Sequence, residues 1–276
     1  MAGALPGISA SNGWLLFAVC LVPVYVNTFD VWRWLLNVVP YGGAPLVPVV
    51  AAVAIALWGV LRTARRRGGT GAWWALAAAV VLGLAALAML DPRYPAKRIH
   101  LVEYVVLALV VRRAAVERLS ATGSLVATAA IAALLGFHDE LLQGIHADRR
   151  FALGDVGVNA LAGCAGALLG HATGLFAGRQ AAGPYRDLDP APAVAAAGWM
   201  LAASGLAAFA IGRLVGTETF PLWIHLPVFG AGLFWILVRD GGRATGARWA
   251  ADVIVLIGLA TAVVPGLVNV TAIDFR

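Results

Sequence analysis

The chain has 276 residues, of which 61% are hydrophobic and only 12% are charged. A soluble domain of this size has too little interior for so much apolar side chain, so the composition excludes a soluble globule and favours a polytopic membrane protein. The formal net charge of +6 does not indicate nucleic-acid binding, because the basic residues lie between hydrophobic runs, where they orient a chain in the bilayer. The lipid bilayer is therefore the expected partner.

Apolar runs long enough to cross a bilayer follow one another along the whole chain. Because a hydrocarbon core of about 30 Å needs roughly 17 to 25 helical residues, we expect an all-α bundle of about nine transmembrane spans. The predicted spans are 14–39 (broken near 27–30), 46–61, 73–90, 99–116, 122–137, 156–176, 194–215, 222–238 and 249–270. The first run has no basic segment ahead of it and continues past Val31, which predicts a retained helix rather than a cleaved signal peptide.

Polar motifs divide the chain into four parts. We expect two amino-terminal spans in 1–72, a motif-bearing core in 73–178, a polar loop in 179–192 and three carboxy-terminal spans in 193–276. On alternate loops, one side of the predicted bundle carries more Lys and Arg than the other. Since these residues are retained on the cytoplasmic face, the amino terminus is expected to be cytoplasmic and the motifs extracytoplasmic.

The first motif is a polar stripe at the start of the span 99–116. Lys97, His100, Glu103 and Tyr104 lie at offsets of three, six and seven residues, which fall on one face of a helix. Glu103 is the most informative of the four, because a carboxylate inside a membrane helix costs several kcal/mol unless it is paired or hydrated. The stripe therefore predicts a partner or a water-filled cavity.

The second motif follows the span 122–137. Asp139 and Gln143 share a face if a helix continues there, Glu140 lies beside them, and Arg149 and Arg150 follow in the loop. Asp155 and Asn159, also four residues apart, enter the next span. Because short connections join these spans, both motifs are expected to emerge on the same membrane face and to form one pocket.

Glycines recur in the span that begins at 156. Gly163, Gly166, Gly170 and Gly174 are spaced by three or four residues, so they share one face of a helix. Small residues at this spacing let a second helix approach closely, and that helix could be the one that carries His100 and Glu103.

Together these motifs resemble the VanZ-like family. The resemblance rests on Lys-x-x-His-x-x-Glu-Tyr, then Asp-Glu-x-x-Gln, then an Arg six residues ahead of Asp-x-x-x-Asn-x-x-x-Gly. The matching residues are Lys97, His100, Glu103, Tyr104, Asp139, Glu140, Gln143, Arg149, Asp155, Asn159 and Gly163. The resemblance covers roughly 73–176. The chain departs from the family between Gln143 and Arg149, where Ile145-His146-Ala147-Asp148 replaces an aromatic residue and Pro-Gly.

The resemblance implies a cellular location and a general role for the protein. Members of the family are bacterial membrane proteins, and the namesake is associated with resistance to the glycopeptide antibiotic teicoplanin. It therefore implies a multi-pass protein of the bacterial cytoplasmic membrane that acts on the cell envelope.

Binding or processing of an anionic envelope component is the first functional interpretation. Lys97, Arg98, Arg149 and Arg150 could meet a phosphate or carboxylate of a lipid head group, a polyprenyl-linked precursor or a glycopeptide. The ligand-binding residues are then Lys97, Glu140, Gln143, Arg149, Asp155 and Asn159. The alternative is purely structural, with Arg149 pairing with Asp139 or Asp155 to hold the end of the bundle together.

A membrane-embedded hydrolase or transferase is the second interpretation. His100 could act as a general base oriented by Glu103 or Asp139, with Tyr104 donating to a developing oxyanion, which makes these four the candidate catalytic residues. A phosphate ester would be the concrete substrate class. No Ser or Cys nucleophile motif accompanies them.

A metal site and a proton relay remain as further alternatives. The potential ligands are His100, His138, Asp139, Glu140, His146 and Asp155. The two histidines of HDELLQGIH are eight residues apart rather than four, so no metal site and no cofactor are expected. A relay or transporter would use His100, Glu103 and Asp155, and would gain support if Asp30 and Arg33 also faced the pocket. The oligomeric state is not indicated.

Overall fold

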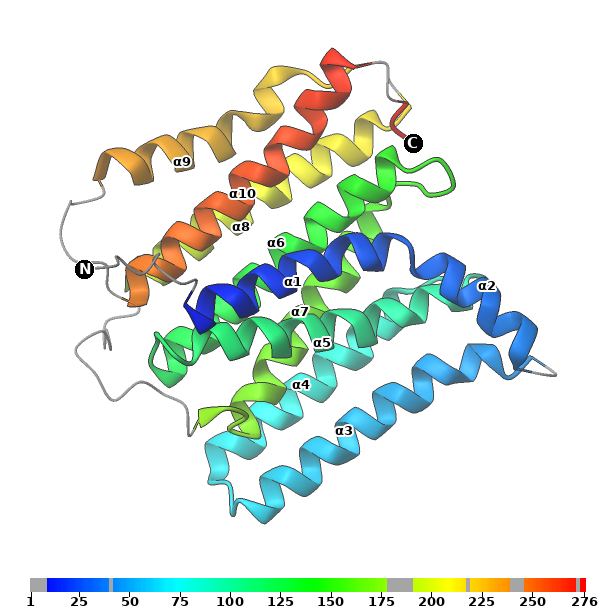
Figure 1. Cartoon of the computed structure of the whole chain (residues 1–276), viewed down its shortest axis with the longest axis vertical. Coiled ribbons are helices and arrows are strands. Elements are labelled where there is room, and N and C mark those ends of the chain that lie inside the picture. The colour runs from blue at the N-terminus through cyan, green and yellow to red at the C-terminus, as the bar shows by residue number, and fades with distance from the viewer. Residues whose placement is uncertain (1–8, 40–41, 178–190, 217–218, 239–245, 272–273) are drawn as a thin grey trace, which may run out of the picture.

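The structure is a computed structural model that describes residues 9–39, 42–177, 191–216, 219–238, 246–271 and 274–276. The regular elements in this part of the chain are helices, as predicted (Figure 1). They are α1 (Ala10–Val26), α2 (Thr28–Val38), α3 (Val47–Arg65), α4 (Thr70–Met89), α5 (Ile99–Ala115), α6 (Ala121–Ile145), α7 (Leu153–Ala172), α8 (Ala191–Leu214), α9 (Leu226–Val238) and α10 (Gly246–Val270). Three short 3-10 helices also occur, namely η1 (Ala44–Leu46), η2 (Pro95–Arg98) and η4 (Leu222–His225).

Six of the described helices are long and apolar enough to cross a membrane, and the bent pair of α1 and α2 would make a seventh span. The six are α3 with the turn before it, α4, α6, α7, α8 and α10. The chain is thus a multi-pass helical membrane protein. The α5 and α9 helices have 17 and 13 residues, at or below the length that a span requires, so the total of about nine spans stays a prediction.

The first predicted span is divided into two helices at Asn27. The α1 and α2 helices meet there at an angle of 57°. The Asn27 side chain donates from Nδ2 to the carbonyl of Pro23 at 2.7 Å, so it competes with the helical hydrogen-bond ladder at this point. The break that the sequence predicted near 27–30 is confirmed, and it exposes polar groups beside the start of α5.

The α7 helix packs against α4, α5 and α6, and its glycines are the points of closest approach. A Cβ atom built on Gly166 would lie 2.7 Å from the carbonyl oxygen of Val105 in α5, and one on Gly163 would lie 2.9 Å from Cβ of Ala132 in α6. The predicted close approach to the helix of His100 and Glu103 is therefore confirmed, and α6 uses the same glycine face. This packing fixes the start of α7 against the ends of the two motif helices.

The three carboxy-terminal helices, α8, α9 and α10, pack on the side of the core that α6 forms. The α8 and α10 helices lie side by side next to α6, with α9 at the outer edge (Figure 1). Phe137 and Leu141 of α6 belong to a second hydrophobic cluster, together with Phe151, Phe220 and Phe275. The loop predicted at 179–192 lies outside the described residues, except for its last two positions, which begin α8.

Candidate functional site

Residues of both sequence motifs meet at one end of the bundle. The site is formed by the break between α1 and α2, the start of α5, the end of α6 and the start of α7. The Nζ atom of Lys97 lies 2.6 Å from Oδ2 of Asp155, and Nδ1 of His100 lies 3.4 Å from Oε2 of Glu103. The predicted convergence of the two motifs is confirmed.

The polar end of α6 is one continuous helix rather than a span followed by a separate element. The sequence predicted that the span ends at 137, which is wrong, because α6 runs on to Ile145 and carries Asp139, Glu140 and Gln143 on its last two turns. The Gln143 amide donates to Oδ2 of Asp139 at 2.9 Å and to Oε1 of Glu140 at 3.1 Å. These hydrogen bonds satisfy polar groups inside the bundle, so the helix does not have to end where its apolar run ends.

The Arg149 guanidinium joins three elements at the mouth of the site. Its Nη2 donates to Oε1 of Gln143 at 2.5 Å, and its Nη1 donates to the carbonyl of Val26 at 3.3 Å. The ring of Phe29 lies 5.7 Å below it. The predicted alternative in which Arg149 pairs with Asp139 or Asp155 is not found. Arg149 is held by neutral partners, so its charge is available to a ligand.

Two neighbouring carboxylates form the buried floor of the site. Asp139 and Glu140 are both fully buried, and neither makes an ion pair with a Lys or Arg among the described residues. Oε2 of Glu140 accepts from the backbone N–H of Ala152 at 3.2 Å, and its Oε1 accepts from Nδ2 of Asn159 at 3.4 Å. The hydroxyl of Tyr104, also fully buried, has no hydrogen-bond partner. Neutral donors alone therefore contact the two carboxyl groups of the floor, apart from His100, which lies beside them.

Above this floor lies a cavity of about 550 Å³. Six of the predicted site residues line it: Lys97, His100, Glu103, Gln143, Arg149 and Asp155. The other four, Tyr104, Asp139, Glu140 and Asn159, are buried and do not line the cavity. The remaining wall includes five aromatic residues, Tyr25, Phe29, Trp32, Tyr94 and Phe151, and the charged Asp148 and Arg150. Arg98 does not line the cavity, and it donates instead to the carbonyl of Pro45 at 3.4 Å.

Two site residues from the first predicted span were missed by sequence reasoning. The Thr28 hydroxyl donates to Oε1 of Glu103 at 2.5 Å, and the Tyr25 hydroxyl donates to the Glu103 backbone carbonyl at 3.1 Å. The polar break at 27–30 was the only indication that α1 and α2 contribute. Asp30 and Arg33 pair with each other at 3.6 Å on the exposed surface and do not line the cavity, so the support expected for a relay is not found.

The carboxy-terminal residues brace the loop between α6 and α7. The backbone N–H of Arg276 donates to the carbonyl of Gly144 at 2.8 Å, and its carbonyl accepts from the N–H of Phe151 at 2.6 Å. A Cβ on Gly144 would lie 2.4 Å from the Phe275 ring, so only glycine allows this close contact. No motif in the sequence indicated this brace, which orders the loop that carries Arg149.

The other histidines lie apart from the floor. His146 accepts through Nδ1 from the backbone N–H of Asp148 at 3.2 Å, and His138 is half-buried with no partner for its buried Nδ1. Among the described residues, one group of three side chains could hold a metal ion, namely His100, Asp139 and Glu140. Their potential ligand atoms all lie within 4.8 Å of one another.

The fold and the site define a multi-pass helical membrane protein with a buried polar network beneath an open cavity at one end of the bundle. Comparison of the chain with protein-family models, with curated proteins and with solved structures found no match.

Proposed function

We propose that this chain is a VanZ-like protein of the bacterial cytoplasmic membrane whose cavity opens on the extracytoplasmic side and binds an anionic component of the cell envelope. In the sequence, the predicted loops on the side of the two motifs carry fewer Lys and Arg residues than the predicted loops on the other side, which supports an extracytoplasmic position. The ligand class includes lipid head groups, polyprenyl-linked precursors and glycopeptides.

The charges at the cavity mouth are the observation that carries this proposal. Three carboxylates line the cavity: Asp155 pairs with Lys97, Glu103 accepts from Thr28, and Asp148 lies exposed at the mouth, next to Arg149 in the chain. Arg149 is held by neutral groups, and Arg150 is exposed and has no ion pair within the described chain. An entering phosphate or carboxylate would therefore meet two guanidinium groups that form no ion pair within the described chain, and guanidinium binds such anions through two parallel hydrogen bonds.

The size and wall of the cavity suit a head group with an attached apolar chain. A volume of about 550 Å³ falls within the range of small-molecule sites, roughly 300 to 1,000 Å³. Phe29 and Trp32 of α2 form one side of the wall, and α2 presents many other apolar side chains outward. The polar part of a ligand would thus lie against Arg149, with its apolar part directed along α2.

Binding of anionic lipids to the full chain in nanodiscs tests the proposal. We expect polyprenyl phosphate or phosphatidylglycerol to bind more tightly than phosphatidylcholine, and Arg149→Gln or Arg150→Gln to weaken anionic binding roughly 10-fold each, about 1.4 kcal/mol. Arg93→Gln is the matched control, because Arg93 lies at the same end, pairs with Asp91 and does not line the cavity. Equal losses in all three variants would mean that only bulk surface charge attracts the lipid.

Processing of the bound ligand is a second candidate function. It is favoured by the contact between His100 and Glu103, in which a carboxylate orients an imidazole that lines the cavity. A phosphate ester of the membrane would be the substrate. If His100→Ala abolishes turnover and retains binding, the site is catalytic; if both are retained, the cavity only binds.

Resistance to teicoplanin is the cellular effect that the proposal implies. Expression of the chain in a glycopeptide-sensitive bacterium should raise the inhibitory concentration of teicoplanin, and Arg149→Gln should remove that effect while Arg93→Gln preserves it. No change on expression of the unmodified chain would contradict a role in resistance.

A further inference from the structure

The floor of the site holds two buried carboxyl groups that pair with no Lys or Arg among the described residues. Asp139 and Glu140 are fully buried on consecutive positions of α6, and their hydrogen-bond donors are the neutral amides of Gln143 and Asn159 and one backbone N–H. Leaving an ionised carboxylate buried without a cation costs several kcal/mol, and two adjacent ones cost more. A cation or a proton must therefore accompany this pair.

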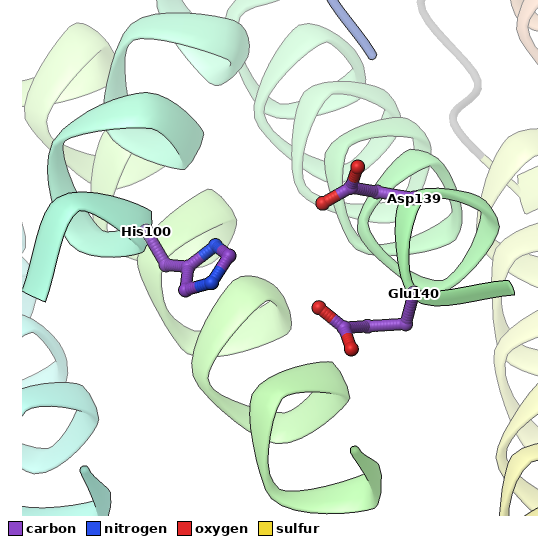
Figure 2. Close-up of side chains that lie close together, drawn as sticks. All are labelled: His100, Asp139 and Glu140. Carbon is purple, nitrogen blue, oxygen red and sulfur yellow. The ribbon is translucent and has the colours of Figure 1, made fainter. Parts of the chain in front are cut away.

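A histidine faces the two carboxylates from the opposite helix. His100 projects from the first turn of α5 toward Asp139 and Glu140 (Figure 2). Each of the three side chains offers a nitrogen or oxygen atom, and these atoms lie within 4.8 Å of one another. Ligand atoms around a metal with bonds of about 2.0 to 2.2 Å are roughly 3 to 3.5 Å apart, so side-chain adjustments on the order of 1 Å would close the set.

Several polar atoms around this group are buried without a hydrogen bond. They are Oδ1 of Asp139, Oδ1 of Asn159 and the hydroxyl of Tyr104, on residues that are fully buried. Buried polar atoms in native proteins nearly always have a partner, so orphaned atoms of three helices around one point indicate a missing ion or water. Oδ1 of Asp139 and Oδ1 of Asn159 are acceptors without a hydrogen bond, and a cation with its bound water would satisfy them.

We propose that His100, Asp139 and Glu140 bind one divalent transition-metal ion. One imidazole and two carboxylates are a mixed nitrogen and oxygen donor set, which suits Zn²⁺ or Mn²⁺ and, as a spectroscopic substitute, Co²⁺. Because His100 also lines the cavity, the metal has a coordination position on the cavity side, beneath the mouth formed by Arg149. An anionic group in the cavity would then bind the metal ion on one side and the Arg149 guanidinium on the other.

Metal content of the full chain purified in detergent tests this assignment directly. After incubation with Zn²⁺, Mn²⁺ or Co²⁺ and removal of free ions, we expect about one ion per chain and a Co²⁺ absorption spectrum with nitrogen and oxygen ligands. Asp139→Asn, Glu140→Gln and His100→Ala should each weaken metal binding roughly 100-fold or more, since even outer partners of a metal site contribute 10- to 100-fold. His146→Ala is the matched control and should retain the ion, because His146 lies outside the group.

The alternatives give different results. If the unmodified chain retains none of the three ions, and infrared spectroscopy shows a protonated carboxyl that disappears in Glu140→Gln or Asp139→Asn, the charge is neutralised by a proton and the metal proposal is wrong. Retention of Co²⁺ with an unchanged spectrum in His100→Ala would likewise contradict it. No envelope ligand is present in these measurements, so failure of lipid binding and failure of metal binding are distinguishable.

Discussion

Lys97 and Asp155, 58 positions apart in the chain, meet in a 2.6 Å contact between Nζ and Oδ2 that ties the turn before α5 to the first turn of α7. Asp155 is suited to this place because the amino-terminal turn of a helix stabilises a carboxylate. This ion pair therefore fixes the position of the first motif relative to the start of α7 at the edge of the cavity.

Removing the cation of this pair should destabilise the fold. Lys97→Met leaves Asp155, whose side chain is only 9% exposed, without a charge partner. Since the Lys97 side chain is itself 34% exposed, we expect a loss of about 1 to 3 kcal/mol rather than the full cost of breaking a buried pair. Denaturant unfolding in detergent measures this loss. Arg93→Met, which breaks the exposed pair with Asp91, should change the free energy of unfolding by less than about 1 kcal/mol.

The contact between α7 and α5 at Gly166 should not tolerate a side chain. A Cβ there would lie 2.7 Å from the Val105 carbonyl oxygen and 2.8 Å from Cβ of Ala108, and backbone atoms cannot move aside without moving the helix. We expect Gly166→Ala to cost about 1 to 3 kcal/mol in thermal unfolding. Gly154→Ala on the first turn of the same helix has open space around it and should be neutral or stabilising. Similar effects of the two changes would contradict the packing.

Arg112, a buried arginine far from the cavity, should contribute to stability and not to ligand binding. Arg112, at the opposite end of α5, is 2% exposed and donates to the Leu175 carbonyl at 3.2 Å and to the Ser124 hydroxyl at 3.4 Å. Arg112→Gln should lower the free energy of unfolding by about 1 to 3 kcal/mol, because buried acceptors lose their donor. Affinity for anionic lipid, measured on the folded fraction, should stay within about 2-fold of the unmodified chain. A selective loss of lipid binding would place a ligand site at that end as well.

Phe275 should control the order of the loop that carries Arg149. Its ring packs on Gly144, lies 5.0 Å from the ring of Phe220 and 5.8 Å from that of Phe151, and is 3% exposed. We expect Phe275→Ala to cost about 3 kcal/mol and to speed amide hydrogen exchange in residues 146–152. Phe17→Ala, at a side chain that is 49% exposed, should leave exchange in this loop unchanged. Slow exchange that persists in Phe275→Ala would show that the loop is ordered without this brace.

The sequence predicted the helical fold and the meeting of its two motifs because both depend on local chemistry. Long apolar runs require a membrane, and costly polar residues such as Glu103 require partners. Spacing by three and four residues identified the faces of α5 and α7, including the contact of Gly166. These features can be predicted from the residue types and their spacing within one span or one or two helical turns.

Other features depend on contacts between distant segments and were missed for that reason. The hydrogen bond from Thr28 to Glu103 requires the bend at Asn27, whose direction the sequence does not specify. The end of α6 was placed too early because hydropathy falls at Asp139, whereas the helix continues once tertiary hydrogen bonds satisfy its polar groups. The contact of Phe275 with Gly144 was missed because no sequence motif indicates it.

Accessibility of the cavity mouth from outside the cell is the most direct test that this polar end of the bundle is an extracytoplasmic binding site. In a background in which Cys20 and Cys164 are replaced by alanine, Asp148→Cys lies in the cavity wall and Gly71→Cys lies at the start of α4, at the opposite end of the bundle. A membrane-impermeant thiol reagent should label Asp148→Cys in intact cells and should label Gly71→Cys only after permeabilisation. Labelling of Gly71→Cys alone in intact cells, or of both positions from one side, would contradict the proposed orientation of the site.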